Sequence, residues 1–191
     1  NSLTINYMNS CKLFDEVNSI ISYQNIEESR RTRRFNTDLL NNNIERVSVL
    51  GLHIKALKEI GQFSNLNYGI ETYNNYVKSN GYSFNIINGD VSRLNSRYPN
   101  GGSELQMSGV YAIYNLQKDN ISILTGLRYS INNINGTFLD SSSSLLFPEI
   151  SLNNKALNGT FNFSYYPHEK TKIHFEISTG FRSPNIDDVG K

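Results

Sequence analysis

Apolar and polar residues alternate along much of the chain, most clearly near its end. From position 173, every second place carries an apolar residue or a threonine: Ile173, Phe175, Ile177, Thr179 and Phe181. Polar residues lie between them: His174, Glu176, Ser178 and Arg182. A period of two is typical of a β-strand with one apolar and one polar face. Pro184 follows and, because proline has no N–H to donate, ends regular pairing.

The same period predicts eight strands, at about 1–8, 13–28, 44–60, 63–78, 104–116, 120–132, 155–166 and 171–182. Four connections are short, at 9–12, 61–62, 117–119 and 167–170, and three are long and polar, at about 28–43, 79–103 and 133–150. Bacterial outer-membrane barrels show this asymmetry of short periplasmic turns and longer extracellular loops. The pattern therefore predicts an all-β fold, an antiparallel transmembrane β-barrel segment of about eight strands.

The expected strands, at about 11–16 residues, exceed the roughly 5–6 usual in globular sheets and suit a tilted crossing of a bilayer. Eight strands could in principle close a small barrel. The alternation is under way at both ends of the chain, so we interpret it as an interior piece with two open edges. Unpaired backbone groups at such edges cost several kcal/mol each in lipid, and we therefore expect this piece not to fold or insert alone.

Composition supports strands with one apolar face. Hydrophobic residues make up only 38% of the chain, yet it has 12 tyrosines and 10 phenylalanines. No run approaches about 18 apolar residues, so no transmembrane helix is predicted, whereas a spanning strand needs only about 9–11 residues. The net charge of +1 gives no support to nucleic-acid binding. With Cys11 as the single cysteine, no intrachain disulfide and no cysteine metal site are expected.

Five motifs, in order, resemble those of one family. The run SRRTRRF at 29–35, with Glu45-Arg46-Val47 after it, resembles a basic loop edge, and NYGIETY at 67–73 resembles a Y-G-x-E strand. The segments 97–103 (RYPNGGS) and 126–129 (GLRY) also match. The run GFRSPNIDDVGK at 180–191 resembles the family's G-F-R-(A/S)-P-N-(I/L)-(D/E) signature. These are motifs of the barrels of TonB-dependent outer-membrane receptors, most closely those of Bacteroidetes.

The resemblance implies that residues 1–191 are a partial receptor barrel domain, without the plug domain and the remaining strands. A family barrel has about 22 strands around a plugged lumen. The implied function is TonB-dependent active uptake of a scarce nutrient across the bacterial cell outer membrane, without covalent chemistry or a cofactor. The implied partners are the plug domain, TonB through parts absent here, a small nutrient ligand and outer-membrane lipid. A siderophore-like or metal-chelate ligand is favoured, and a glycan-import receptor remains an alternative.

The resemblance also suggests where a ligand would be met. The long segments 79–103 and 133–150, together with Asn185–Asp188, are expected to form an outer vestibule. Its candidate ligand-facing residues are Arg97, Tyr98, Arg182, Asn185, Asp187 and Asp188. Within this set we expect Arg182 to be a structural anchor, because its five donors could satisfy backbone groups freed where Pro184 breaks the ladder.

No residue pattern predicts a catalytic or metal site. His53, His168 and His174 lack a metal-ligand spacing, and no nucleophile elbow, Walker loop or His-Glu-x-x-His motif is present. Glu176, Asp187 and Asp188 are expected in structural pairs rather than as a catalytic pair. The arginine cluster is expected to be a solvated loop edge paired with Glu27 and Glu28, with binding of an anionic ligand or lipopolysaccharide phosphate as the alternative. Its members are Arg30, Arg31, Arg33 and Arg34.

Strand parity predicts which residues share a face. Those expected to face lipid are Ile121, Ile123, Leu127, Phe161, Phe163, Ile173, Phe175 and Ile177, and those expected to face the lumen are Ser122, Arg128, Asn162, His174 and Glu176. Six tyrosines near strand ends are expected in interfacial girdles: Tyr7, Tyr23, Tyr68, Tyr129, Tyr165 and Tyr166. Two rivals remain: a small complete barrel or adhesin, and a soluble carbohydrate-binding sandwich that would present Asn65, Asn67 and Ser122 on a solvated face.

Overall fold

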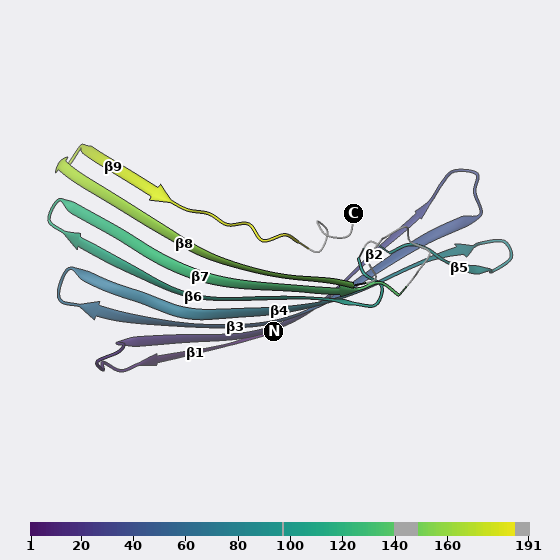
Figure 1. The fold of residues 1–191 in the computed structure, drawn as a ribbon, viewed down its shortest axis with the longest axis horizontal. Helices are drawn as coiled ribbons and strands as arrows, with labels where there is room; N and C mark the ends of the chain where they lie inside the picture. Colours follow the sequence, from purple (N-terminus) through teal and green to yellow (C-terminus); the bar gives the residue numbers. More distant parts are fainter. Residues whose placement is uncertain (97, 140–148, 186–191) are drawn as a thin grey trace.

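The computed structural model describes residues 1–96, 98–139 and 149–185, which form one antiparallel sheet of nine strands (Figure 1). The strands are β1 (Ser2–Met8), β2 (Glu16–Arg33), β3 (Leu39–Ile60), β4 (Ser64–Asn85), β5 (Val91–Arg93), β6 (Ser103–Lys118), β7 (Ile121–Thr137), β8 (Glu149–His168) and β9 (Thr171–Ser178). They follow the order β1-β2-β3-β4-β6-β7-β8-β9, with β5 paired to the far end of β4. The all-β, antiparallel prediction is confirmed.

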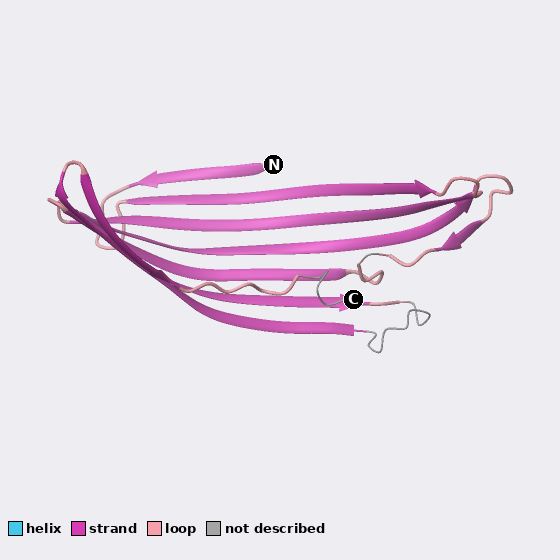
Figure 2. Cartoon of the chain, turned by 90° about the horizontal axis from the view of Figure 1, so that it is seen from above, coloured by secondary structure: helices cyan, strands magenta, loops and turns pink. Residues whose placement is uncertain are grey.

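The sheet is a single long, curved layer (Figures 1 and 2). The described residues contain no helix that could cross a membrane. Only three hydrophobic side chains among them are buried: Ala56, Val77 and Ile134. The sheet order leaves β1 and β9 at its two edges, so these described strands are not closed into a barrel. A layer with so little core must place its apolar side chains against something other than itself.

The turns at one end of the sheet lie close to where the alternation places them. They occupy residues 9–15, 61–63, 119–120 and 169–170, and Figure 1 shows all four at the same end. Gly61, with φ of 68°, and Asp119, with φ of 49°, supply the left-handed conformations that such tight reversals need.

The strands at the opposite end run further than predicted. Much of the polar segment 28–43 is strand, because β2 continues to Arg33 and β3 begins at Leu39. Likewise β4 extends to Asn85, and β5 lies within residues 79–103, which were predicted to be a long polar connection. Backbone ladders do not require alternation, so strands persist where both faces are polar. The pattern therefore located the apolar part of each strand, not its end. Part of the third long segment, 140–148, lies outside the described residues.

Successive turns are staggered along the sheet. Following Cα partners from Glu16 leads across the sheet to Leu57, Asn67, Ile113, Gly126, Thr160 and Ser178. β2 begins on this line, β3 ends three residues past it at Ile60, and β9 begins seven residues from it at Thr171. Seven residues over six strand spacings correspond to a strand tilt of roughly 40°. Closed barrels have tilts of about 35–45°, so the sheet has the shear of a barrel wall.

The two faces of the sheet differ in polarity along the part of the strands nearest the four short turns. The register places the eight residues predicted to face lipid on one face, here called the apolar face, and the five predicted to face the lumen on the other, the polar face. Thirteen apolar-face side chains, among others, are exposed: Leu3, Ile5, Tyr7, Ile21, Tyr23, Leu50, Ile70, Val110, Leu127, Leu157, Ile173, Phe175 and Ile177. Exposed apolar area this continuous marks a surface made for another apolar phase.

The apolar residues form a band, and on the side away from the short turns the band ends at polar residues of the same face. On β7 it runs from Ile121 to Ile131, which at a tilt of about 40° spans roughly 25 Å. Asn133 and Asn135 continue the same face, and their side chains bond Gln106 and Ser151 on the neighbouring strands. Tyrosines on the apolar face mark both margins: Tyr7, Tyr68 and Tyr165 near the turns, and Tyr23 and Tyr129 near the polar residues. Tyr166 directly follows Tyr165 and takes the opposite parity.

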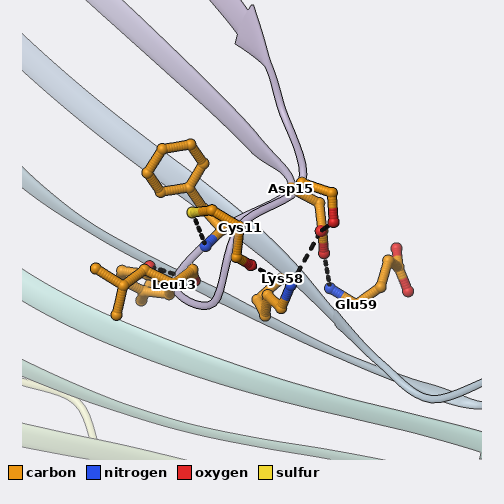
Figure 3. Close-up of polar contacts among 8 residues, drawn as sticks. Cys11, Leu13, Asp15, Lys58 and Glu59 are labelled. Atoms are coloured by element: carbon orange, nitrogen blue, oxygen red, sulfur yellow. Dashed lines mark hydrogen bonds and ion pairs between the residues drawn. The ribbon is translucent and has the colours of Figure 1, made fainter.

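The turn between β1 and β2 is fastened to the next two strands (Figure 3). The Asp15 carboxylate accepts hydrogen bonds from the Glu59 backbone N–H at 2.8 Å and from Lys58 Nζ at 3.0 Å. Lys58 Nζ also donates to the Cys11 carbonyl at 2.6 Å, and the Tyr68 hydroxyl donates to the Leu13 carbonyl at 2.8 Å. Hydrogen bonds from the Ser10 hydroxyl, the Glu59 backbone and Lys58 lower the pKa of Asp15 to about 2.

Candidate functional site

The polar face carries a four-residue network that spans β3, β4, β6 and β7. His53 and Glu71 are Cα partners on β3 and β4. The Tyr111 hydroxyl on β6 lies 2.9 Å from His53 Nε2, and Arg128 on β7 forms an ion pair with Glu71. Arg128 Nε also donates to Ser130 Oγ at 3.0 Å. Each of these two links passes over one strand. The His53–Tyr111 contact joins β3 to β6 over β4, and the Glu71–Arg128 ion pair joins β4 to β7 over β6.

Glycines make these long links possible. Gly69 is the cross-strand partner of Tyr111, so the tyrosine ring lies over β4 on its way to His53 on β3. A Cβ at Gly69 would lie 2.8 Å from the Tyr111 hydroxyl and 2.4 Å from the Ile54 carbonyl oxygen. Both separations are below van der Waals contact, so this position has room only for a hydrogen.

Arg128 uses the same device one strand further along. Its partner is not glycine, but Gly109 on β6 lies beneath its guanidinium, and a Cβ there would be 2.7 Å from Arg128 Nη2. Gly109 pairs with Glu71 on one side and with Ser130 on the other. Arg128 bonds Glu71 across Gly109 and also bonds Ser130 on its own strand. We call Gly69 and Gly109 the glycine saddles. Because of them the long side chains lie flat along the wall.

A hollow of about 460 Å³ adjoins the network on the polar face. Its floor includes Gly126, and its polar lining includes Arg128, Asn158 and Thr160. A second polar pair lies across β8 and β9, where Ser164 Oγ is 2.9 Å from His174 Nδ1. His53 and His174 thus each lie within hydrogen-bond distance of a side chain on another strand. In the described residues, no group of three His, Cys, Asp or Glu side chains could hold a metal ion.

The connecting residues 94–96 and 98–100, here called the inward segment, turn over the polar face. At one end, the Leu94 carbonyl oxygen lies 2.5 Å from where a Cβ on Gly81 would be. At the other end, Pro99 Cγ lies 3.0 Å from the corresponding position on Gly136. Beneath the segment, Ser79 and Ile134 are each only 1% exposed and Ser103 is 2% exposed. The segment narrows this end of the polar face.

Of the predicted vestibule residues, the structure describes Tyr98, Arg182 and Asn185. Tyr98 is half-buried in the inward segment, and its carbonyl accepts a hydrogen bond from Ser96 Oγ at 2.7 Å. Arg182 and Asn185 are exposed, in a non-strand stretch after β9. Arg97, Asp187 and Asp188 lie outside the described residues. The predicted alternation through Arg182 ends at Ser178, so strand parity does not set the direction of Arg182.

The arginine cluster lies where β2 ends and the next turn begins, and all four residues are exposed, as expected for a solvated loop edge. Arg30, Arg31 and Arg33 belong to β2 and alternate between its faces, and only Arg34 lies in the turn. Arg30 bonds Glu28 at 2.8 Å as expected, whereas Glu27 bonds Arg46 on β3 at 2.7 Å. A four-arginine patch facing one anion is therefore not formed.

Sequence reasoning missed the network of His53, Glu71, Tyr111 and Arg128. Each residue was placed on a strand, but the bonds between them skip a strand and depend on register. The usable signal was the placement of glycines inside otherwise regular strands, which marks close approach of other groups.

The sheet is a tilted single layer with one apolar face, one polar face and short turns at one end. This is the architecture of a transmembrane β-barrel wall. The family model "TonB dependent receptor-like, beta-barrel" matches residues 3–191, and the chain belongs to that family. Among solved structures it is similar to "Copper transporter OprC", with a TM-score of 0.74 and 10% identity over 93% of this chain. The chain spans 29% of that transporter's chain. No curated protein matches the sequence.

Proposed function

We propose that this chain is part of the barrel wall of a bacterial outer-membrane receptor that takes up a scarce nutrient with energy from TonB. The observation that carries the proposal is the division of one tilted sheet into an apolar and a polar face, in a chain of the TonB-dependent receptor family. The apolar face meets lipid, and the polar face lines the lumen against the plug domain of the same receptor. Residues 1–191 are then a partial barrel domain, and no enzymatic step is involved.

The favoured ligand is a siderophore-like molecule or another metal chelate, in a receptor of the Bacteroidetes type. The polar network and its hollow offer hydroxyl, imidazole, guanidinium and carboxylate groups, which suit a polar ligand. The structurally similar transporter is named for copper, which agrees with a metal-containing cargo. A glycan-import receptor is the alternative.

Two rival functions find less support. A small complete barrel or adhesin needs β1 to pair with β9, and the sheet order contains no such pairing among the described strands. A soluble sandwich needs a second layer over the apolar face, and the described residues form one sheet.

Uptake in cells tests the proposal. The full-length receptor gene would be deleted and restored in its host, and accumulation of ⁵⁵Fe supplied with a hydroxamate or a catecholate siderophore, and of ⁶⁴Cu, would be measured. We expect receptor-dependent accumulation of one probe that disappears in a strain without TonB. Uptake that persists without TonB contradicts the transport mechanism. A receptor-dependent growth defect on glycans alone contradicts the chelate assignment only.

Orientation has a built-in control, since Cys11 lies exposed in the turn at the opposite end from β5. Intact cells carrying Ser92→Cys in a Cys11→Ser background should react with a membrane-impermeant maleimide. The native Cys11 should react only after the outer membrane is opened. The reverse pattern would place the long connections in the periplasm.

We further propose that the outer vestibule includes Arg97, Tyr98, Arg182, Asn185, Asp187 and Asp188, with Arg182 as its structural anchor. A lysine keeps the charge of Arg182 but loses the planar fork of donors. In the full-length receptor, Arg182→Lys should therefore lower the amount of folded barrel nearly as much as Arg182→Ala. If Arg182→Ala leaves folding unchanged and abolishes ligand binding, Arg182 belongs among the binding residues.

A further inference from the structure

Several oxygen-bearing residues are neighbours on the polar face, by strand register and by the approach of the Leu94 and Asn95 carbonyls to Gly81. Glu28, Glu45 and Ser79 form one row across β2, β3 and β4, because Glu28 and Glu45 are Cα partners and so are Glu45 and Ser79. Asn43 lies two residues from Glu45 on the same face and pairs with Gly81. These four side chains and the Leu94 and Asn95 carbonyls are here called the oxygen cluster.

Two carboxylates in this row oppose each other directly. Like charges at paired positions of an antiparallel sheet destabilise it. Arg30 neutralises Glu28 alone, through a contact of 2.8 Å. Among the described residues, no hydrogen bond or ion pair involves the Glu45 side chain, although the residue is only 6% exposed. A charge so enclosed is unfavourable unless something of opposite sign approaches it.

The neutral members of the cluster also have unused oxygens. Ser79 is 1% exposed, and its Oγ has no hydrogen-bond partner in the structure. The buried Asn43 Oδ1 is likewise without a partner, even though Arg30 is its direct cross-strand neighbour. Above them, the Leu94 and Asn95 carbonyl oxygens lie 2.5 and 3.1 Å from where a Cβ on Gly81 would be. Gly81 thus brings main-chain oxygens down onto the same face.

We propose that the oxygen cluster binds a divalent cation, with Ca²⁺ as the chemical class. Calcium takes six to eight oxygen ligands from carboxylates, carbonyls and waters in flexible geometry. A bound cation would relieve the repulsion between Glu28 and Glu45 and give the Ser79 and Asn43 oxygens a partner. The cluster holds no nitrogen or sulfur ligand, which disfavours zinc and copper. Magnesium is disfavoured because it demands near-ideal octahedral geometry.

The site would hold the inward segment against the wall, since Leu94 and Asn95 come from the segment and the other ligands from three strands. This is a structural role that goes beyond nutrient uptake and does not require the cargo to contain metal. With two carboxylates and several neutral oxygens, we expect a dissociation constant on the order of 10⁻⁴–10⁻³ M.

Calorimetric titration of the purified full-length receptor with CaCl₂ and MgCl₂ tests the proposal. Glu45→Gln should weaken Ca²⁺ binding at least 10-fold, and Asn43→Asp, which adds a carboxylate, should strengthen it. Glu104→Gln is the matched control and should leave binding unchanged, because Glu104 on β6 lies on the other face of the sheet from the oxygen cluster. In tryptic digestion, Ca²⁺ should slow cleavage after Arg93 in the native receptor and not in Glu45→Gln.

Three outcomes would overturn the site: no saturable Ca²⁺ binding by the native receptor at 10-fold above the expected dissociation constant, equal binding by Glu45→Gln, or Ca²⁺-independent cleavage. If Glu45→Gln fails to fold, Ser79→Ala removes one ligand without removing a charge and should weaken binding 3-fold or more. Uptake of the nutrient is a separate readout, so failure of this site leaves the transport proposal untouched.

Discussion

The two faces of the sheet are built by different rules. The apolar face repeats one simple choice at every second residue, and each side chain depends little on its neighbours. The polar face is built from long links that skip a strand, such as Tyr111 to His53 over Gly69. A single substitution should therefore act through solvation on the apolar face and through geometry on the polar face.

The largest expected effect comes from charging the apolar face. Phe163 lies two residues from the centre of the apolar band on β8, so Phe163→Arg in the full-length receptor should lower the free energy of unfolding in lipid vesicles by about 2–4 kcal/mol. Asn162→Arg, on the polar face of the same strand, should change it far less. Urea-unfolding curves of the two variants measure the difference. Equal losses would mean that Phe163 does not face hydrocarbon.

Filling a glycine saddle should have the next largest effect. A Cβ at Gly69 would meet the Ile54 carbonyl oxygen at 2.4 Å, and backbone cannot move away cheaply, so Gly69→Ala should cost about 1–3 kcal/mol. Gly159→Ala is the control, because its nearest neighbour is the flexible end of Leu127 at 3.3 Å. That variant should stay within about 0.5 kcal/mol of the native receptor. Comparable losses in both would mean that the close approach of the Ile54 carbonyl to Gly69 does not set the cost.

The ion pair across the second saddle should contribute less. A double-mutant cycle with Glu71→Gln and Arg128→Met should give a coupling free energy of about 1 kcal/mol, because the side chains are only 24% and 39% exposed. The same cycle on Glu27 and Arg46, which are at least half exposed, should give about 0.5 kcal/mol or less. A larger coupling for the exposed pair would remove any special role for the polar-face network.

The smallest effect should appear at the turn between β1 and β2. The pKa of Asp15 is about 2 in the folded protein against an ordinary value of 3.8, so its carboxylate stabilises the fold above about pH 4. This contribution is lost as pH falls through 2. Asp15→Asn should therefore lower stability at pH 6 and make a much smaller difference near pH 2. Unfolding midpoints of both proteins at the two pH values measure it, and a pH-independent difference would contradict the assignment.

How far the sequence predicts this fold depends on the face. Alternation placed Ile173, Phe175 and Ile177 correctly because burial in an apolar phase acts on each residue separately. It failed at the far ends of β2, β3 and β4, where polar residues on both faces leave no period although the backbone ladder continues.

The candidate site was less predictable, for a related reason. The sequence shows only that His53 has no metal-ligand spacing, whereas its contact with Tyr111 joins residues 58 positions apart and depends on the register of three strands. Gly69 and Gly81 carried information about close approach without showing what approaches. The inward path of residues 94–96 and 98–100 could not be inferred either, since the composition of a loop does not determine its direction.

The glycine saddles also determine how far the side chains of the polar face project from the sheet. Tyr111 and Arg128 are among the longest side chains on the polar face, yet each lies along the sheet across a glycine instead of standing upright from it. The surface facing inward is therefore shallow and stiff, with its charged and aromatic ends already tied to the sheet. A bulky body could slide past such a surface without having to push side chains aside, and each saddle glycine would set the clearance at its own level of the wall.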